Sequence, residues 1–212
     1  MEPPRSADEL LASTLRTGDV VVFNRFCRSL APHRAALCLA SKYGLSGDGR
    51  GCWDHAALVV RDRRTDVAYL LEGGAGAVTM RTYEERMGEF ADATEAVLLR
   101  AGAEASDAAA AGLDRLLRDE LRLRPSPDGF DAAGASRCDN LAEVYRQLRA
   151  QQAPRVARRA DGEEADAGCN FGAPLVARGL QRLGLVDGGV AVESVTPAQL
   201  FSLRRAPQVV LR

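Results

Sequence analysis

The sequence predicts an α+β fold in which an antiparallel sheet packs against helices. Apolar, strand-like runs gather in the first half of the 212-residue chain, and most helical patterns follow them. Successive strands are joined by short polar turns, which is typical of hairpins and not of parallel strand–helix–strand units. Near the C-terminus, residues 174–186 carry the apolar spacing of a helix that packs on a sheet.

The first half of the chain supplies most of the predicted sheet. A short helix comes first, with Ser6 as its N-cap and Glu9 completing a capping box. A second helix is expected to begin at Pro32 and to end at Gly44. The predicted strands lie at residues 19–24, 55–62, 67–74 and 95–101, and residues 76–87 predict a further strand followed by the start of a helix.

The second half is mainly helical. Ser106 is the expected N-cap of a helix over residues 106–124, and residues 137–152 predict another helix. Residues 153–168 are polar and charged, which favours a loop, and the chain closes with a strand at 207–212. We therefore expect a single domain over 1–212 with a helical insertion at about 104–165.

Composition excludes several classes of protein. The 28 basic and 29 acidic residues leave a net charge of −1, which gives no reason to expect a nucleic-acid partner. The sequence has no signal-peptide pattern and no apolar run of membrane-spanning length, so no integral membrane segment is expected. Five unevenly spaced cysteines do not form a disulfide framework, so we expect a cytoplasmic protein with reduced thiols.

A thiol, an imidazole and a carboxylate form the main candidate site. Cys169 lies just before the helix start, where the helix dipole would lower the pKa of its thiol. A hairpin centred near Arg64 would place His55 opposite Glu72, so that the carboxylate could orient the imidazole. Polar residues at strand ends and before glycine-rich turns are also common without any function.

Metal binding is a weaker alternative. Cys52 and His55 have a spacing seen in zinc pairs, and Cys27, His33 and Cys38 are conceivable further ligands. This pattern matches no recognised zinc finger, so we expect neither a metal nor another cofactor. The glycine-rich stretch after Glu72 has no lysine and no following helix start, so it predicts a tight turn and not a phosphate-binding loop.

Five segments in this order resemble the circularly permuted papain-like proteins. They read TGDVVVF, DHAALVV, AYLLEGGAGAVTMRTYEER, LVARGLQRLGL and VTPAQLFS, and they fall within residues 15–100 and 168–203. The resemblance is to the YiiX-like branch, which is related to the NlpC-type peptidases and more distantly to lecithin retinol acyltransferase. It implies an antiparallel sheet curled into a small barrel, packed against the helix that bears the cysteine.

The resemblance also implies a chemistry and a departure from it. The family forms thioesters while hydrolysing or transferring acyl groups of amides or esters, and the implied set here is Cys169, His55 and Glu72. However, an ungapped match places the family's nucleophile at Gly172, three residues after Cys169. Trp53 either forms an apolar wall for a substrate or fills the core.

Two hypotheses follow from the sequence. The chain is either a cysteine hydrolase or acyltransferase, acting on a small-molecule, lipid or peptide acyl substrate, or a pseudoenzyme. In the second case Gly172 marks a lost nucleophile, and the cleft binds a peptide, a lipid or a protein. A small zinc-stabilised interaction domain is the third alternative. The sequence indicates neither the substrate nor the oligomeric state.

Overall fold

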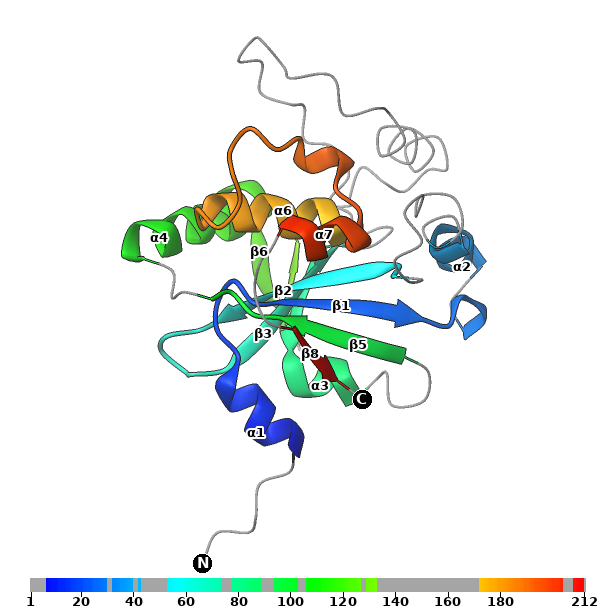
Figure 1. Ribbon diagram of the computed structural model, residues 1–212. Coiled ribbons are helices and arrows are strands. Elements are labelled where there is room, and N and C mark those ends of the chain that lie inside the picture. The colour runs from blue at the N-terminus through cyan, green and yellow to red at the C-terminus, as the bar shows by residue number, and fades with distance from the viewer. Residues whose placement is uncertain are drawn as a thin grey trace, which may run out of the picture.

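An antiparallel sheet forms the centre of the protein (Figure 1). The computed structural model describes residues 7–29, 32–39, 42, 53–73, 78–88, 94–102, 106–126, 129–132, 172–203 and 208–211. Within these residues the eight strands are ordered β6-β7-β4-β3-β2-β1-β5-β8, and every pairing is antiparallel. No described pairing joins β6 to β8, the two outer strands, so the sheet is open. Its five central strands are β4, β3, β2, β1 and β5.

The strands are short and mostly apolar. They are β1 (Val20–Arg25), β2 (His55–Arg61), β3 (Ala68–Gly73), β4 (Val78–Thr82), β5 (Thr94–Leu99), β6 (Leu123–Ser126), β7 (Gly129–Ala132) and β8 (Gln208–Leu211). The five central strands coincide with the predicted ones to within a few residues. The α+β class is therefore confirmed at the level of an antiparallel sheet with packed helices.

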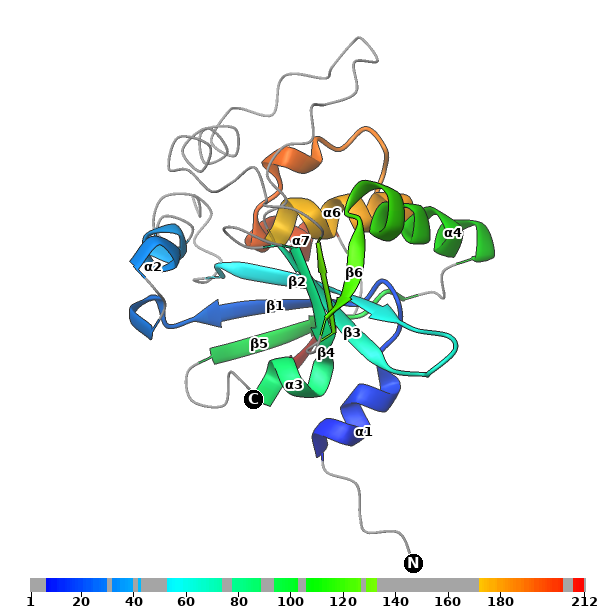
Figure 2. The ribbon, with the colours of Figure 1, turned by 180° about the vertical axis from the view of Figure 1, so that it is seen from behind.

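Helices cover both faces of the sheet. The described α-helices are α1 (Ala7–Thr14), α2 (Pro32–Leu39), α3 (Tyr83–Gly88), α4 (Asp107–Arg115), α6 (Gly172–Arg182) and α7 (Pro197–Leu203). Helices α4, α6 and α7 lie on one face, and α1 and α3 lie on the other (Figures 1 and 2). Three short helical turns, η1 (Cys27–Ser29), η3 (Leu116–Glu120) and η4 (Val192–Ser194), complete the described elements.

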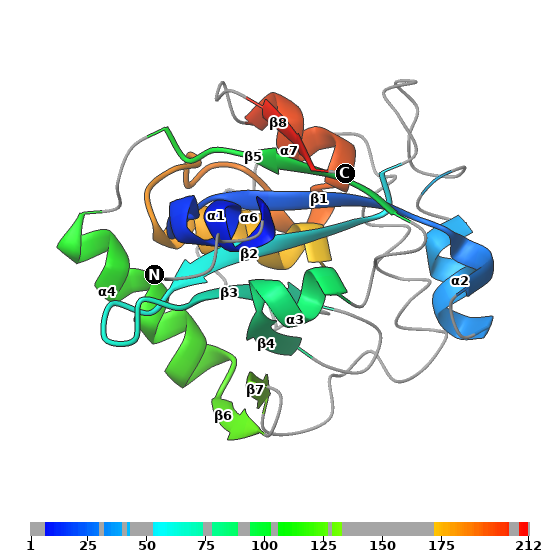
Figure 3. The same cartoon turned by 90° about the horizontal axis from the view of Figure 1, so that it is seen from below.

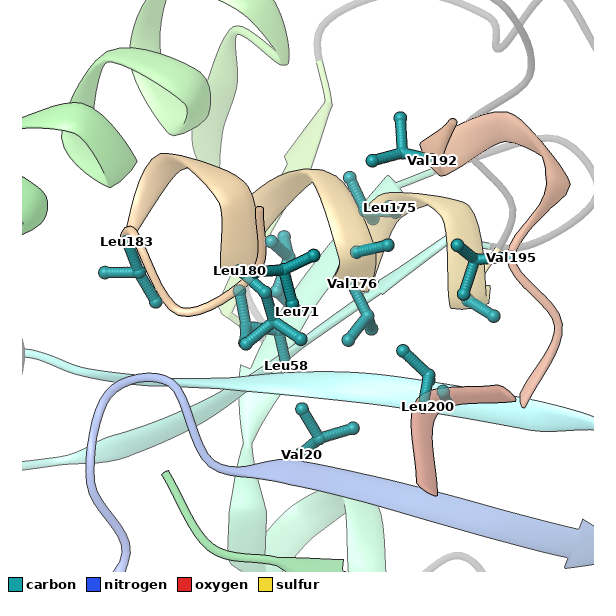
Figure 4. Close-up of a cluster of buried hydrophobic side chains, with 14 of the residues drawn as sticks. Val20, Leu58, Leu71, Leu175, Val176, Leu180, Leu183, Val192, Val195 and Leu200 are labelled. Carbon is teal, nitrogen blue, oxygen red and sulfur yellow. The ribbon is translucent and has the colours of Figure 1, made fainter. Parts of the chain in front are cut away.

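Strand alternation produces two apolar cores. In β1, Val20 and Val22 face α6, whereas Val21 and Phe23 face α1 and α3. The core under α6 is the larger, and Figure 4 shows its leucine and valine side chains meeting between α6, α7 and the sheet. Burying apolar side chains on both faces is the main stabilising term of such a fold. Helix α6 is thereby held tightly on β2 and β3.

One glycine permits the close approach of α4 to α6. A Cβ atom built on Gly112 would lie 2.7 Å from the backbone oxygen of Arg182, which is too close for any real contact. We expect Gly112→Ala to destabilise the protein by about 1–2 kcal/mol, because the crowding outweighs the better helix propensity of alanine. Urea unfolding would measure this change.

Gly188→Ala is the matched control for that substitution. Gly188 is exposed, and no heavy atom lies within 4 Å of the position its Cβ would take. We expect Gly188→Ala to leave the stability within about 0.5 kcal/mol of the wild type. If Gly112→Ala is as stable as this control, the two helices do not pack as closely as described.

The predicted helices are confirmed only in part. Ser106 does cap α4, because its Oγ accepts a hydrogen bond from the Ala109 N–H at 3.2 Å. That helix ends earlier than predicted, through the π-helical turn η3, and β6 and β7 follow where no strands were expected. The second helix is described over Pro32–Leu39. The predictions for Ser6, for residues 137–152 and for residues 153–168 lie outside the described residues.

Cys27 and Cys38 are joined by a disulfide that links η1 to α2. Their Cα atoms lie 5.4 Å apart. The expectation of reduced thiols is therefore wrong for this pair, because folding of α2 returns Cys38 to Cys27 in a way that the spacing alone does not reveal. The bond also removes both sulfurs from the zinc alternative. Among the described residues, no group of three or more His, Cys, Asp or Glu side chains could hold a metal ion.

The described helices are too short or too polar to cross a lipid bilayer.

Candidate functional site

His55 is the first residue of β2 and lies at the end of the sheet beside the start of α6. It pairs with Phe23 of β1, and the two rings lie 5.8 Å apart, measured between their centroids. Only 8% of His55 is exposed. The start of the strand therefore holds a titratable group in a nearly water-free position.

Glu72 of β3 contacts the imidazole, although the predicted register was wrong. Glu72 pairs with Ala57 and not with His55, because the turn between β2 and β3 is centred one position later than expected. His55 and Ala57 are two residues apart, so their side chains leave the same face of the sheet. His55 Nε2 and Glu72 Oε1 lie 3.4 Å apart across this diagonal, which is long for a hydrogen bond but close enough for the carboxylate to orient the imidazole.

Arg86 of α3 completes the buried group and was not predicted. Its Nε donates to Glu72 Oε2 at 2.5 Å, and its guanidinium lies 5.9 Å from the centre of the Phe23 ring. Arg86 and Glu72 are only 7% and 5% exposed. Arg86 follows the buried Tyr83 by three residues, so both side chains lie on the face of α3 that packs on the sheet.

Burial and charge set the protonation states. Burial lowers the pKa of His55 below its usual value, and the charge of Arg25 lowers it further, although Glu72 opposes both effects. Burial by itself raises the pKa of Glu72, but contact with His55 and Arg86 more than offsets this, and the pKa falls to about 2. At neutral pH the group thus contains a carboxylate, a guanidinium and a neutral imidazole.

The neutral imidazole presents one nitrogen toward α6. The Glu72 carboxylate lies beside Nε2, and its negative charge favours the tautomer with the proton on Nε2 and the lone pair on Nδ1. A Cβ atom built on Gly172 would lie 3.0 Å from His55 Nδ1 and 3.0 Å from the backbone oxygen of Ala56. The proton acceptor therefore faces a position at which the chain has no side chain.

Asp54, the residue before His55, fixes the start of β2 to the end of β1. Its carboxylate accepts from the backbone N–H of Arg25 at 2.6 Å and from the Arg25 side chain at 2.7 Å. Lys42 Nζ approaches the same carboxylate at 3.9 Å. The Asp54 side chain is fully buried. This contact holds Arg25 near the imidazole, where its charge adds to burial in lowering the pKa of His55.

Of the remaining predicted site residues, Gly172 and Trp53 are described by the structure and Cys169 is not. Gly172 is the first residue of α6 and is buried. Trp53 is half-buried and packs on Phe201 of α7, with ring centroids 5.3 Å apart, so it belongs to the edge of the larger core. Cys169 lies outside the described residues, and the distance from its sulfur to His55 stays untested.

Comparison with known proteins adds no relative. No family model matches the chain, and no curated protein matches its sequence. The chemistry of the site follows from its own residues: a buried, oriented base that faces the beginning of a helix.

Proposed function

We propose that this protein is a non-catalytic member of the circularly permuted papain-like group and acts as a binding module. One observation supports this most directly: His55 Nδ1 faces Gly172, the residue that aligns with the family's nucleophile. A side chain at position 172 would lie closer to the imidazole than ordinary packing permits. A Cβ atom at position 172 therefore requires His55 or α6 to move by a few tenths of an ångström, which a chain without a side chain at this position avoids.

In this function His55, Glu72 and Arg86 have a structural role. They connect β2, β3 and α3 through one buried polar group, and α6 packs over its edge. A peptide, lipid or protein ligand would then bind to the surface of a rigid scaffold, without acyl transfer.

A cysteine hydrolase that uses Cys169 is the second candidate. It is favoured by the orientation of the imidazole, because a neutral histidine held by a carboxylate is suited to take a proton from a thiol. Cys169 precedes Gly172 by three residues, a length of chain that spans up to about 10 Å. The Cys169 thiolate would attack an amide or ester carbonyl, and His55 would return the proton to the leaving group.

Thiol reactivity separates the two candidates. The full-length protein is treated with p-nitrophenyl acetate and, separately, with iodoacetamide, and the modified cysteines are identified by mass spectrometry. For a non-catalytic protein we expect no selective acetylation of Cys169, and we expect His55→Gln to leave its alkylation rate unchanged. Rapid, His55-dependent acetylation of Cys169, with Cys138→Ala as the matched control, would establish the hydrolase instead.

A restored thiol tests the position of the lost nucleophile. In a Cys169→Ser background, Gly172→Cys places a thiol at the start of α6 beside His55, and Gly188→Cys places one on an exposed loop. We expect the thiol at 172 to react at least about tenfold faster at neutral pH, because the helix start and the base lower its pKa. Equal rates in a variant with an unchanged far-ultraviolet CD spectrum would contradict the assignment of Gly172.

A further inference from the structure

A disulfide and a lysine both attach the segment around α2 to the end of β1. The disulfide joins Cys27 of η1 to Cys38 of α2. Cys38 Sγ lies 3.8 Å from the backbone oxygen of Arg25, the last residue of β1. Lys42, which follows α2 in the chain, donates through Nζ to the same oxygen. The bridged segment therefore contacts β1 at its last residue.

Arg25 connects this segment to His55. Its Nε donates to Asp54 Oδ2 at 2.7 Å, and its backbone N–H donates to Asp54 Oδ1 at 2.6 Å. Asp54 immediately precedes His55 in the chain. Burial lowers the pKa of His55 most, and the charge of Arg25 adds to this effect. The other charges that act on the imidazole are those of Glu72 on β3, which raises the pKa, and Arg86 on α3, which lowers it. The position of Arg25 therefore influences the imidazole.

The disulfide is separate from the two apolar cores. Among the described residues, neither core includes a member of η1 or α2. Helix α2 lies beyond the ends of β1 and β2 (Figures 1 and 3). It has eight residues, and a helix of this length has little stability of its own. Of the elements that the structure describes, η1 is its main contact. Opening the bond is therefore expected to release α2 and to leave the sheet folded.

We propose that the Cys27–Cys38 disulfide is a redox switch that fixes α2 in place and, through Arg25, sets the surroundings of His55. The reductant is a dithiol. One of its thiolates attacks a protein sulfur to form a mixed disulfide, and the other protein sulfur leaves as a thiolate. The second thiolate of the reductant then displaces the first protein sulfur. The reductant ends as a disulfide, and its two electrons, with two protons, give two protein thiols.

Access to the bond requires a local opening. Cys27 and Cys38 are only 8% and 1% exposed, so a reductant reaches their sulfurs when α2 opens. Once the bond is reduced, the covalent link between α2 and η1 is lost and the attachment at Arg25 weakens. The switch rests on the contacts of Arg25 and His55, and so it does not depend on either candidate function.

NMR signals of the imidazole measure the effect on His55. The chain has two histidines, so His33→Gln leaves His55 as the one titrating imidazole. This variant is titrated in its oxidised form and after reduction with dithiothreitol. We expect the pKa of His55 to be higher by about 0.5 or more in the reduced protein, because the charge of Arg25 is held less closely. Amide hydrogen exchange should become at least about tenfold faster in α2 and stay unchanged in β2 and β3.

Two variants in the same background are the controls. Cys27→Ser combined with Cys38→Ser should behave like the reduced protein, with or without dithiothreitol, although it retains the other three cysteines. Arg25→Gln should raise the pKa of His55 and make it independent of the state of the disulfide, since the charge that links the two is absent.

Three results would overturn the proposal. The first is a bond that dithiothreitol reduces only in urea concentrations that unfold the sheet. The second is a reduced protein that loses its far-ultraviolet CD spectrum, because the disulfide is then part of the global fold. The third is an equal pKa of His55 in the oxidised and the reduced protein, because α2 then has no influence on the imidazole.

Discussion

Replacing Arg86 with methionine is expected to destabilise the protein by about 3–5 kcal/mol. The substitution leaves the Glu72 carboxylate in a nearly water-free position without its permanently charged partner, and an unpaired buried charge is among the most costly defects in a core. Methionine keeps most of the apolar volume, so the loss is chiefly electrostatic. Urea unfolding followed by CD would measure the change in the free energy of unfolding.

Two controls separate charge from packing in this experiment. Arg86→Met combined with Glu72→Gln removes both charges, and we expect it to recover more than half of the lost stability. Arg63→Met breaks an exposed ion pair with Asp107, in which the side chains are 68% and 93% exposed. We expect that change to cost less than about 1 kcal/mol. An Arg86→Met protein as stable as Arg63→Met would show that Arg86 is not buried against Glu72.

Acid is expected to destabilise the protein in two steps, both caused by the same buried group. The pKa of His55 in the folded protein lies below its unfolded value of 6.5, so the unfolded chain binds the proton first and stability begins to fall below about pH 6.5. The pKa of Glu72 falls from 4.5 to about 2, so its contribution is complete above about pH 4.5 and is lost between there and about pH 2.

Variants assign each step to a residue. Urea unfolding is measured from neutral to acid pH for the wild type, His55→Gln and Glu72→Gln. We expect His55→Gln to lack the upper step and Glu72→Gln to show a smaller loss in the lower range. If the His55→Gln protein loses the same stability between pH 7 and pH 5 as the wild type, His55 is not the group that is buried in its neutral form.

The elements were easier to predict than the contacts between them. Period-2 apolar runs and turn residues located the central strands, and Ser106 located a helix start, because these signals are local. The register between β2 and β3 was predicted wrongly by two residues, because the turn is centred one position later than expected and no sequence signal fixes that turn. His55 and Glu72 still meet, because side chains alternate between the two faces of a strand and a shift of two residues returns them to the same face.

Other parts of the site could not be predicted because they depend on tertiary packing. Arg86 reads as a surface residue of an acidic helix until α3 is placed on the sheet, where it meets Glu72. The disulfide depends in the same way on the return of α2 toward η1. Gly172 was singled out from the sequence only through a family resemblance, and the structure places it beside His55.

Because Arg86 lies on α3, this six-residue helix influences the protonation of His55 on β2. His55 is oriented by Glu72, and Glu72 is kept ionised by Arg86, which belongs to α3. A helix of this length does not persist unless it is packed, so brief local opening of α3 removes the guanidinium from the carboxylate. The ionisation of Glu72, and through it the orientation of His55, therefore depends on whether α3 is packed on the sheet, and not on β2 and β3 alone.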